Sequence, residues 1–100
     1  MDKTNVINIA KDYKELISRY VDFDNVYLFG SHAKGYAKEF SDIDIAVVVE
    51  YLKSDYMQTV QMLWKLRNDI DVRIEPHLIV RSNDIPCFYD EIVRSGILIS

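Results

Sequence analysis

The chain has 100 residues, of which 49% are apolar and 28% charged, and its formal net charge is −4. This length suits one domain, residues 1–100, and the acidic balance argues against strong nucleic-acid binding, which needs a dense basic patch. No apolar run approaches the roughly 18 residues that span a bilayer, and the single Cys87 cannot form an internal disulfide, so we expect a soluble protein of the cytoplasm.

The N-terminal segment predicts an amphipathic helix from Thr4 to Tyr20, with Thr4 as its N-cap. Apolar residues recur there at steps of three and four, which places their side chains on one helix face. This face would consist of Val6, Ile9, Ala10, Tyr13, Leu16, Ile17 and Tyr20. A polar turn then leads to the first strand.

The next segment, from Val26 to Val49, predicts a strand, a glycine turn, a short helix and a second strand. Because side chains alternate along a strand, Asp42 and Asp44 share one face of the second strand. Two neighbouring carboxylates repel each other and raise one pKa unless a cation lies between them. Mg²⁺ is the natural candidate, since it takes hard oxygen ligands and shares the rest with water and phosphate.

A glycine and a serine, Gly30 and Ser31, stand at the turn after the first strand. Glycine adopts backbone angles closed to other residues and lets a ligand approach the main chain. Ser31 falls where a helix should begin, so its hydroxyl and the free N–H groups of that turn would face an anion such as a phosphate. An anion site beside a metal-binding carboxylate pair suits phosphoryl or nucleotidyl transfer.

The second half of the chain predicts a helix, a strand, a helix and a short strand. Ser54 and Asp55 mark the start of a helix that reaches about Arg67, with Trp64 expected in the core or, alternatively, stacked on an adenine. Alternation predicts a strand from Ile70 to Glu75, and Pro76 places it at a sheet edge or near its end. His77 to Val80 could continue this strand after the break at Pro76.

The last helix should start at the capping segment Asn83-Asp84-Ile85-Pro86 and end at about Arg94. Gly96 occupies the C′ position, and Ile97 to Ile99 form the last strand. Strands alternating with helices give an α/β or α+β domain, a small mixed sheet of three to four strands flanked by helices.

The central segment resembles the signature of the DNA-polymerase-β-type nucleotidyltransferase superfamily. More closely, it resembles the minimal nucleotidyltransferase (MNT) proteins, single small domains often encoded beside a HEPN-domain partner. The resemblance covers an apolar strand, a Gly-Ser pair, ten residues and an Asp-x-Asp, and its residues are Gly30, Ser31, Gly35, Ser41, Asp42, Ile43 and Asp44. It implies a nucleotidyltransferase fold.

The family completes its metal site with a third carboxylate from a neighbouring strand, and both Asp71 and Glu75 qualify by alternation. Glu75 is preferred, because its distance to the closing segment from Pro86 to Gly96 is nearer to that of MNT relatives. Asp71 is the alternative. Either side chain would otherwise form a charge pair with Arg73 on a solvated face, which contributes little.

Other polar residues near the signature have two interpretations each. Lys34 and Lys38 could offset triphosphate charge, and relatives often carry Arg at the positions of Lys34 and His32. Lys lacks the planar fork of Arg, and His32 could bind a phosphate or cap the short helix. Ser41 is expected to steady the turn beside the nucleotide rather than act as a nucleophile. His77 could lie near the metal, although a lone His is more often structural.

The resemblance implies a two-metal nucleotidyl transfer. Asp42, Asp44 and Glu75 would hold Mg²⁺, and a nucleoside triphosphate, AMP being transferred from ATP, would bind through Gly30, Ser31, Lys34 and Ser41. The chain lacks the extra domain with which larger relatives bind their acceptor, so the acceptor surface would come from a partner or a second copy. MNT proteins imply a HEPN toxin as this partner, neutralised by the transfer, which makes the chain an antitoxin.

Two other functions stay open at this point. The first is a catalytically inactive nucleotide- or protein-binding module of the same fold, which the retained acidic residues argue against. The second is a nucleotidylating enzyme for a small molecule such as an antibiotic, which the missing substrate domain argues against.

Overall fold

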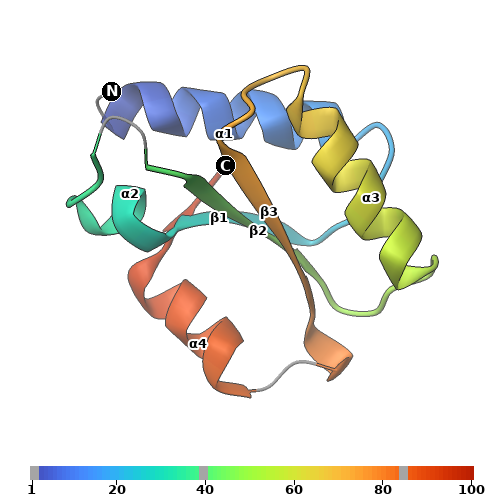
Figure 1. Cartoon of the computed structure of the whole chain (residues 1–100). Helices are drawn as coiled ribbons and strands as arrows, with labels where there is room; N and C mark the ends of the chain where they lie inside the picture. Colours follow the sequence, from blue (N-terminus) through green and yellow to red (C-terminus); the bar gives the residue numbers. More distant parts are fainter. Residues whose placement is uncertain (1–2, 39–40, 84–85) are drawn as a thin grey trace.

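The computed structural model describes residues 3–38, 41–83 and 86–100. Helices and strands alternate along most of the chain, as predicted (Figure 1). In chain order the elements are α1 (Lys3–Ile17), β1 (Asn25–Phe29), α2 (Gly30–Lys34), β2 (Ile43–Val49), α3 (Tyr56–Arg67), β3 (Ile74–Val80), the 3-10 turn η1 (Arg81–Asn83), α4 (Pro86–Ser95) and β4 (Ile97–Leu98).

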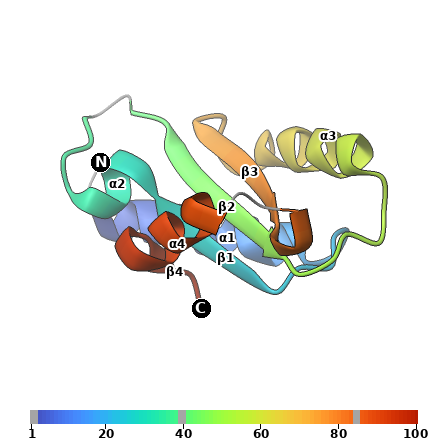
Figure 2. The ribbon, with the colours of Figure 1, turned by 90° about the horizontal axis from the view of Figure 1, so that it is seen from below.

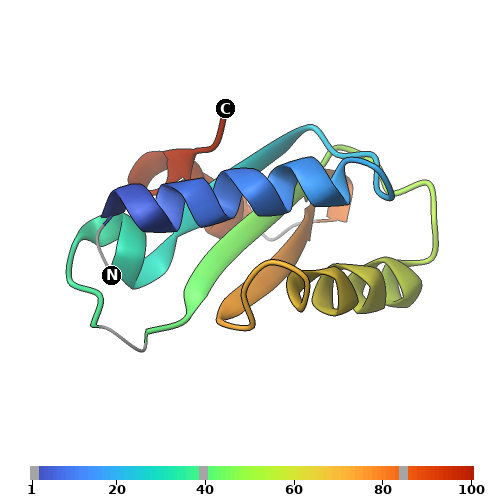
Figure 3. The same cartoon turned by 90° about the horizontal axis from the view of Figure 1, so that it is seen from above.

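The strands form one mixed sheet in the order β3-β2-β1-β4. β1 pairs antiparallel with both β2 and β4, whereas β2 and β3 are parallel. The parallel pair requires a crossover, and α3 supplies it. Seen from above, α1 and α3 lie over one face of the sheet (Figure 3), and seen from below, α4 lies over the other (Figure 2). This confirms the predicted fold class, a small mixed sheet flanked by helices.

The main core fills the space between the sheet and the α1/α3 layer. Alternate residues of β1, β2 and β3 point into it, in agreement with the period of two along a strand. Its buried residues include Val6, Ala10, Tyr13, Ile17, Val26, Leu28, Ile43, Ile45, Val47, Leu63, Leu66, Ile74 and Leu78.

The opposite face of the sheet is only partly apolar. Ala46, Val48, Ile79 and Ile92 form a small buried cluster there, with Tyr27, Phe29 and Tyr89 packed against it. The remaining positions of this face carry the acidic residues at the start of β2 and β3. The α1/α3 face of the sheet is therefore fully apolar, whereas the face under α4 combines a small apolar cluster with acidic side chains.

The first helix is shorter than predicted. It begins at Lys3 and ends at Ile17, so Thr4 lies inside the helix and is not its N-cap. Tyr20 follows the helix and is 60% exposed. Four of the predicted apolar positions, Val6, Ala10, Tyr13 and Ile17, are buried, whereas Ile9 and Leu16 are half-buried. Within the part of the chain that the structure describes, no helix is long and apolar enough to cross a membrane.

The third strand does not lie where alternation placed it. Residues 68–71 continue the turn after α3, since Ile70 and Asp71 both donate their backbone N–H to Arg67 O, and β3 begins only at Ile74. Pro76 lies inside this strand, opposite Ile45. Ile43 N–H donates to Arg73 O, and alternation from Arg73 turns the Pro76 nitrogen away from β2. Because β3 is an edge strand, the missing N–H leaves no ladder bond broken.

The side chain of Arg67 covers part of this outer edge. Its Nη1 donates to the carbonyl oxygens of Val72 and Ile74, and its guanidinium lies 4.7 Å from the centre of the Trp64 ring. Trp64 is 38% exposed, so its predicted place in the core was wrong. The buried face of α3 is instead Thr59, Leu63 and Leu66, and α3 covers the sheet face opposite the acidic residues.

The C-terminal elements agree with the predicted order. α4 begins at Pro86 and ends at Ser95, while Asp84 and Ile85 of the predicted capping segment lie outside the described residues. Gly96 follows the helix as predicted, but its φ is not positive. Its Cβ-free backbone is needed for space, because a Cβ there would overlap Ile92 O and lie 3.1 Å from Leu28 O. β4 is shorter than predicted and ends at Leu98.

The buried hydroxyl of Tyr13 ties α1 to α3 by donating to Leu63 O at 2.7 Å. Tyr13→Phe should therefore lower the free energy of unfolding by about 1 kcal/mol, since a buried hydrogen bond is lost while the ring volume is kept. Chemical denaturation monitored by circular dichroism measures this change. Tyr20→Phe, at an exposed position, is the matched control, and an equal loss in both variants would contradict the assignment.

Candidate active site

Four polar side chains meet on the α4 face of the sheet, where β2 and β3 begin. Asp44 and Glu75 are register partners on the parallel strands, and His77 lies two pairs further along, opposite Ala46, on the same face as Glu75. Asp42 precedes β2 and shares the face of Asp44 by alternation. The parallel register thus brings residues more than 30 positions apart in sequence onto one patch of the sheet.

Three of these side chains form a compact set of ligand atoms. His77 Nε2 lies 3.4 Å from Asp44 Oδ1 and 3.8 Å from Glu75 Oε1. One ligand atom from each of Asp44, Glu75 and His77 lies within 4.8 Å of the other two, and all three residues are half-buried. Such a set can surround one cation.

The fourth side chain, Asp42, contacts this set through Glu75. The pKa of Glu75 is raised by burial first, then by a hydrogen bond shared with Asp42 and by the negative charges of Asp44 and Asp42, while His77 acts in the opposite direction. Crowded carboxylates of this kind favour a bound proton or a bound cation. The predicted acidic residues Asp42, Asp44 and Glu75 are therefore brought together.

The donor set fits a divalent cation. Carboxylate oxygens are the ligands that Mg²⁺ and Mn²⁺ share, and an imidazole nitrogen is acceptable to the latter. Burial first, and then the neighbouring acids, raise the pKa of Glu75, and a cation would offset both effects by its positive charge. The side chains of Asp44 and Glu75 are 25% and 37% exposed, so the set is open to solvent.

Gly30 lies directly against the acidic set. Its φ is +73°, and a Cβ at this position would overlap Asp44 Oδ2 and lie 3.2 Å from Asp44 Cγ. The antiparallel pairing explains the approach, because Phe29 is the register partner of Asp44. Both the backbone angle and the contact require glycine here. Ser31, the next residue, lies in the first turn of α2 and is half-buried.

The loop between α2 and β2 is held by His32 and Ser41. His32 is buried, 6% exposed, and its Nε2 lies 3.3 Å from Ser41 O, while Ser41 Oγ accepts a hydrogen bond from the backbone N–H of Lys38. His32 thus bonds the backbone of the loop, which is neither of its two predicted roles, helix capping or phosphate contact. Ser41 steadies the turn before Asp42, as expected, and its contact with a nucleotide stays a prediction.

Lys34 projects from α2 toward α4. Its Nζ lies 3.8 Å from Glu91 Oε1, and its side chain is 41% exposed, so this ion pair is weak and the ammonium is free to move. Its predicted role in nucleotide binding, like that of Ser31, stays a prediction.

Asp71, the alternative third carboxylate, is used elsewhere. It lies in the turn before β3, where its Oδ1 and Oδ2 accept hydrogen bonds from the Arg73 guanidinium and Oδ1 also accepts from Arg73 N–H. These bonds lower the pKa of Asp71 despite partial burial. Asp71 is thus the residue that pairs with Arg73, and Glu75 is the one that faces Asp44.

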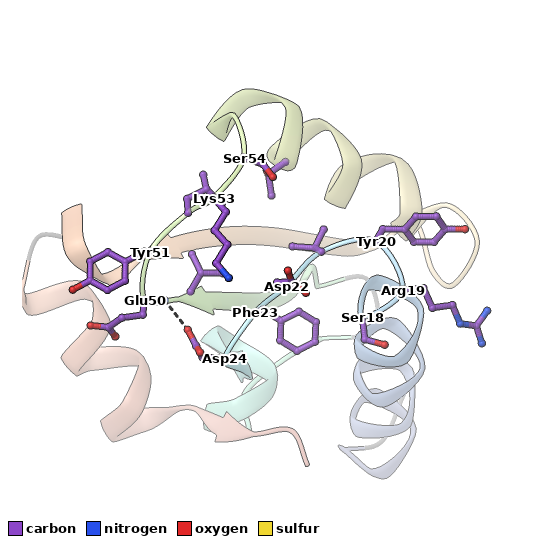
Figure 4. Close-up of a pocket in the computed structure, with 14 residues that line it drawn as sticks. Ser18, Arg19, Tyr20, Asp22, Phe23, Asp24, Glu50, Tyr51, Lys53 and Ser54 are labelled. Atoms are coloured by element: carbon purple, nitrogen blue, oxygen red, sulfur yellow. Dashed lines mark hydrogen bonds between the residues drawn. The ribbon is translucent and has the colours of Figure 1, made fainter.

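A cavity of about 380 Å³ lies at the opposite end of β2, between the end of α1 and the loop after β2 (Figure 4). Asp24 and Glu50 line one side of this cavity, where Asp24 Oδ2 accepts a hydrogen bond from Glu50 N–H. Since β2 runs from the acidic set at its start to this cavity at its end, the cavity is separate from the candidate active site.

Sequence reasoning gave His77 less weight than the structure does. A lone histidine carries no motif, and the strand predicted from Ile70 to Glu75 was expected to break at Pro76, with His77 to Val80 only as a possible continuation. The available signal was its parity, because residues two apart on a strand share a face. Because Pro76 lies within an edge strand, Glu75 and His77 are two residues apart on that strand and their side chains share one face.

The mixed sheet and the acidic set beside a Gly-Ser corner define a protein of the nucleotidyltransferase class. A family model described as "Polymerase beta, Nucleotidyltransferase" matches residues 5–100. The chain belongs to this nucleotidyltransferase family.

Individual relatives agree with this assignment. A Methanocaldococcus jannaschii protein named "Putative protein adenylyltransferase MJ0141" is 28% identical over 96 residues, or 92% of this chain and 96% of the relative. Among solved structures, a "putative nucleotidyltransferase" from Sulfolobus solfataricus has a TM-score of 0.68 at 21% identity, covering 96% of this chain and 80% of that one, and therefore shows the fold. A toxin–antitoxin structure with AMP-PNP has a TM-score of 0.67 at 26% identity, covering 93% and 73% of the two chains.

The raised pKa of Glu75 means that the folded chain favours the protonated form of this side chain. Its contribution to stability is therefore fully present below its unfolded pKa and is lost as the pH rises through its folded pKa. At neutral pH without a cation, Glu75→Gln should therefore be slightly more stable than the natural chain, by about 0.5 kcal/mol after solvent screening of a partly exposed group. The gain should vanish below pH ~4, under the usual Glu value. Urea denaturation in EDTA at both pH values tests this, and destabilisation by Glu75→Gln at neutral pH would contradict it.

Proposed function

We propose that the chain is a divalent-cation-dependent nucleotidyltransferase that transfers AMP from ATP to an acceptor on a partner protein. The observation that carries the proposal is the meeting of Asp42, Asp44 and Glu75 beside Gly30, within a domain of the nucleotidyltransferase family. We further propose that residues 1–100 act as one minimal nucleotidyltransferase domain.

In this proposal Asp42, Asp44 and Glu75 hold Mg²⁺, in a site for two ions. When bound, the cation stabilises negative charge on the phosphate oxygens of the substrate. The carboxylates position the reacting end of the triphosphate, and the Gly30–Ser31 corner holds its β- and γ-phosphates through backbone N–H groups and the Ser31 hydroxyl. Lys34 adds a positive charge that moves from Glu91 to the phosphates, and Ser41 holds the loop from which Asp42 projects.

The transfer itself follows from this placement. The acceptor hydroxyl gives up its proton to water, its oxygen forms a bond to the α-phosphorus, and the bond from that phosphorus to the bridging oxygen breaks, so that the electron pair leaves with pyrophosphate. In-line geometry requires the acceptor on the side of the α-phosphate away from the Gly30–Ser31 corner.

The acceptor in this proposal is a HEPN-domain toxin, with this chain as its antitoxin. Support comes from two relatives: one is named as an adenylyltransferase of proteins, and the other belongs to a toxin–antitoxin pair with an ATP analogue. We place the reaction in the cytoplasm, where ATP is abundant and a single Cys stays reduced.

The test is transfer of label from α-labelled ATP to the product of the neighbouring gene, with and without Mg²⁺. The proposal expects labelled partner with the natural chain and with the control Asp71→Asn, and none with Asp42→Asn or in EDTA. A natural chain that labels no partner and releases no pyrophosphate, yet binds the partner, would identify the inactive binding module instead. Label on small molecules alone would identify the third function considered above.

A further inference from the structure

His77 is placed as a ligand would be, and the carboxylate signature of the family does not account for it. Its Nε2 is the ring atom nearest both acids, 3.4 Å from Asp44 Oδ1 and 3.8 Å from Glu75 Oε1. These separations exceed those of strong charge-assisted hydrogen bonds. They suit neighbouring ligands of one ion, which would lie to one side of the three atoms at about 2.1 Å from each.

Packing, together with the long 3.4 Å hydrogen bond between Nε2 and Asp44 Oδ1, sets the orientation of the ring. Phe29 contacts the His77 ring edge-to-face, with centroids 5.0 Å apart and planes at 69°, and Phe88 in turn contacts Phe29 at 6.0 Å. Phe29 is also the register partner of Asp44. The same residue therefore fixes the imidazole and lies beside the carboxylate, which pre-organises the two donors relative to each other.

We propose that His77 Nε2 is a nitrogen ligand of the cation held by Asp44 and Glu75, and that this ligand shifts the preference of the site from Mg²⁺ toward Mn²⁺. The inference rests on the proposed function only in requiring a cation at these carboxylates. A neutral imidazole suits first-row transition metals, whereas Mg²⁺ strongly prefers oxygen. An all-carboxylate site would discriminate less between the two ions.

Binding of each ion to the natural chain and to His77→Asn and His77→Gln, by calorimetry without nucleotide, measures the preference. Loss of a ligand should weaken Mn²⁺ binding about tenfold in both variants and change Mg²⁺ binding much less. His77→Gln can still donate a hydrogen bond to Asp44, so it separates ligation from positioning. Thermal melting in EDTA checks that the variants are folded.

Pulsed EPR of bound Mn²⁺ supplies a readout independent of affinity. The natural chain should show a nitrogen coupling that changes when histidine is labelled with ¹⁵N and is absent in His77→Asn. The only other histidine of the sequence is His32, whose Nε2 is bonded to Ser41 O. A nitrogen coupling that is lost in His77→Asn can therefore be assigned to His77.

The outcomes separate the two proposals. Mn²⁺ bound without nitrogen coupling, or a Mn²⁺ affinity restored by His77→Gln, overturns the role of His77 and leaves the carboxylate site in place. Failure of the natural chain to bind either ion overturns both. An unchanged ratio of Mn²⁺ to Mg²⁺ affinity in His77→Asn overturns the shift in preference.

Discussion

Replacing Asp44 with asparagine is expected to slow nucleotidyl transfer by at least about 100-fold while the chain stays folded. Asp44 lies at the centre of the acidic set. It pairs in register with Glu75, its Oδ1 lies 3.4 Å from His77 Nε2, and its side chain contacts Gly30. Asparagine keeps the shape and removes the charge that a cation requires. Initial rates of pyrophosphate release at saturating Mg²⁺, with melting curves of both proteins, measure the effect.

The matched control is Asp71→Asn. Asp71 is also a carboxylate beside β3, but its oxygens are bound to Arg73. Because its pKa is lowered, Asp71 contributes stability that is present above its usual pKa and lost as the pH falls through its folded value. This variant should thus lose some stability at neutral pH and keep its rate. Equal rates for Asp44→Asn and Asp71→Asn would remove Asp44 from the site.

Gly30→Ala is expected to lose both stability and cation binding. A residue with a side chain at φ +73° costs about 1–2 kcal/mol, and the added Cβ would overlap Asp44 Oδ2. The carboxylate must then rotate or the strand must shift, which separates it from Glu75 and His77. Urea denaturation measures the first loss, and the shift in melting temperature on adding Mg²⁺ or Mn²⁺ measures the second.

Gly35→Ala separates the two effects. Gly35 ends α2 with φ +86°, but a Cβ there would meet nothing within 4 Å. It should therefore show the backbone cost alone, with an unchanged response to the cation. A Gly30→Ala protein that responded to the cation as fully as Gly35→Ala would show that the close approach to Asp44 has no part in binding.

Much of the fold could be predicted because its signals are local. The short apolar runs from Val26 to Phe29 and from Ile43 to Val49 mark two strands, and the Gly-Ser corner and the Asp55 cap mark two helix starts. The alternation of side chains along a strand put Asp42 and Asp44 on one face.

The remainder depended on contacts between distant residues. Pro76 in the sequence predicts either an edge strand or the end of a strand, and only the strand order, with β3 at the edge of the sheet, decides between them. The position of β3 in turn decides between Asp71 and Glu75, and it brings His77 to the acids. Trp64 was misplaced for a similar reason, since the periodicity of α3 is weak and the exposed ring is retained by Arg67.

The edges of the sheet constrain how any partner could associate with this chain. On the β3 side, Pro76 offers no N–H and Arg67 already occupies the carbonyls of Val72 and Ile74. On the other side, β4 has two residues, and Lys14 Nζ donates to Ile99 O just beyond it. Neither border is a good template for an added strand. A protein that meets this domain must therefore recognise side chains on its outer surfaces, so that substitutions of surface residues, rather than of backbone-pairing positions, should govern the choice of partner.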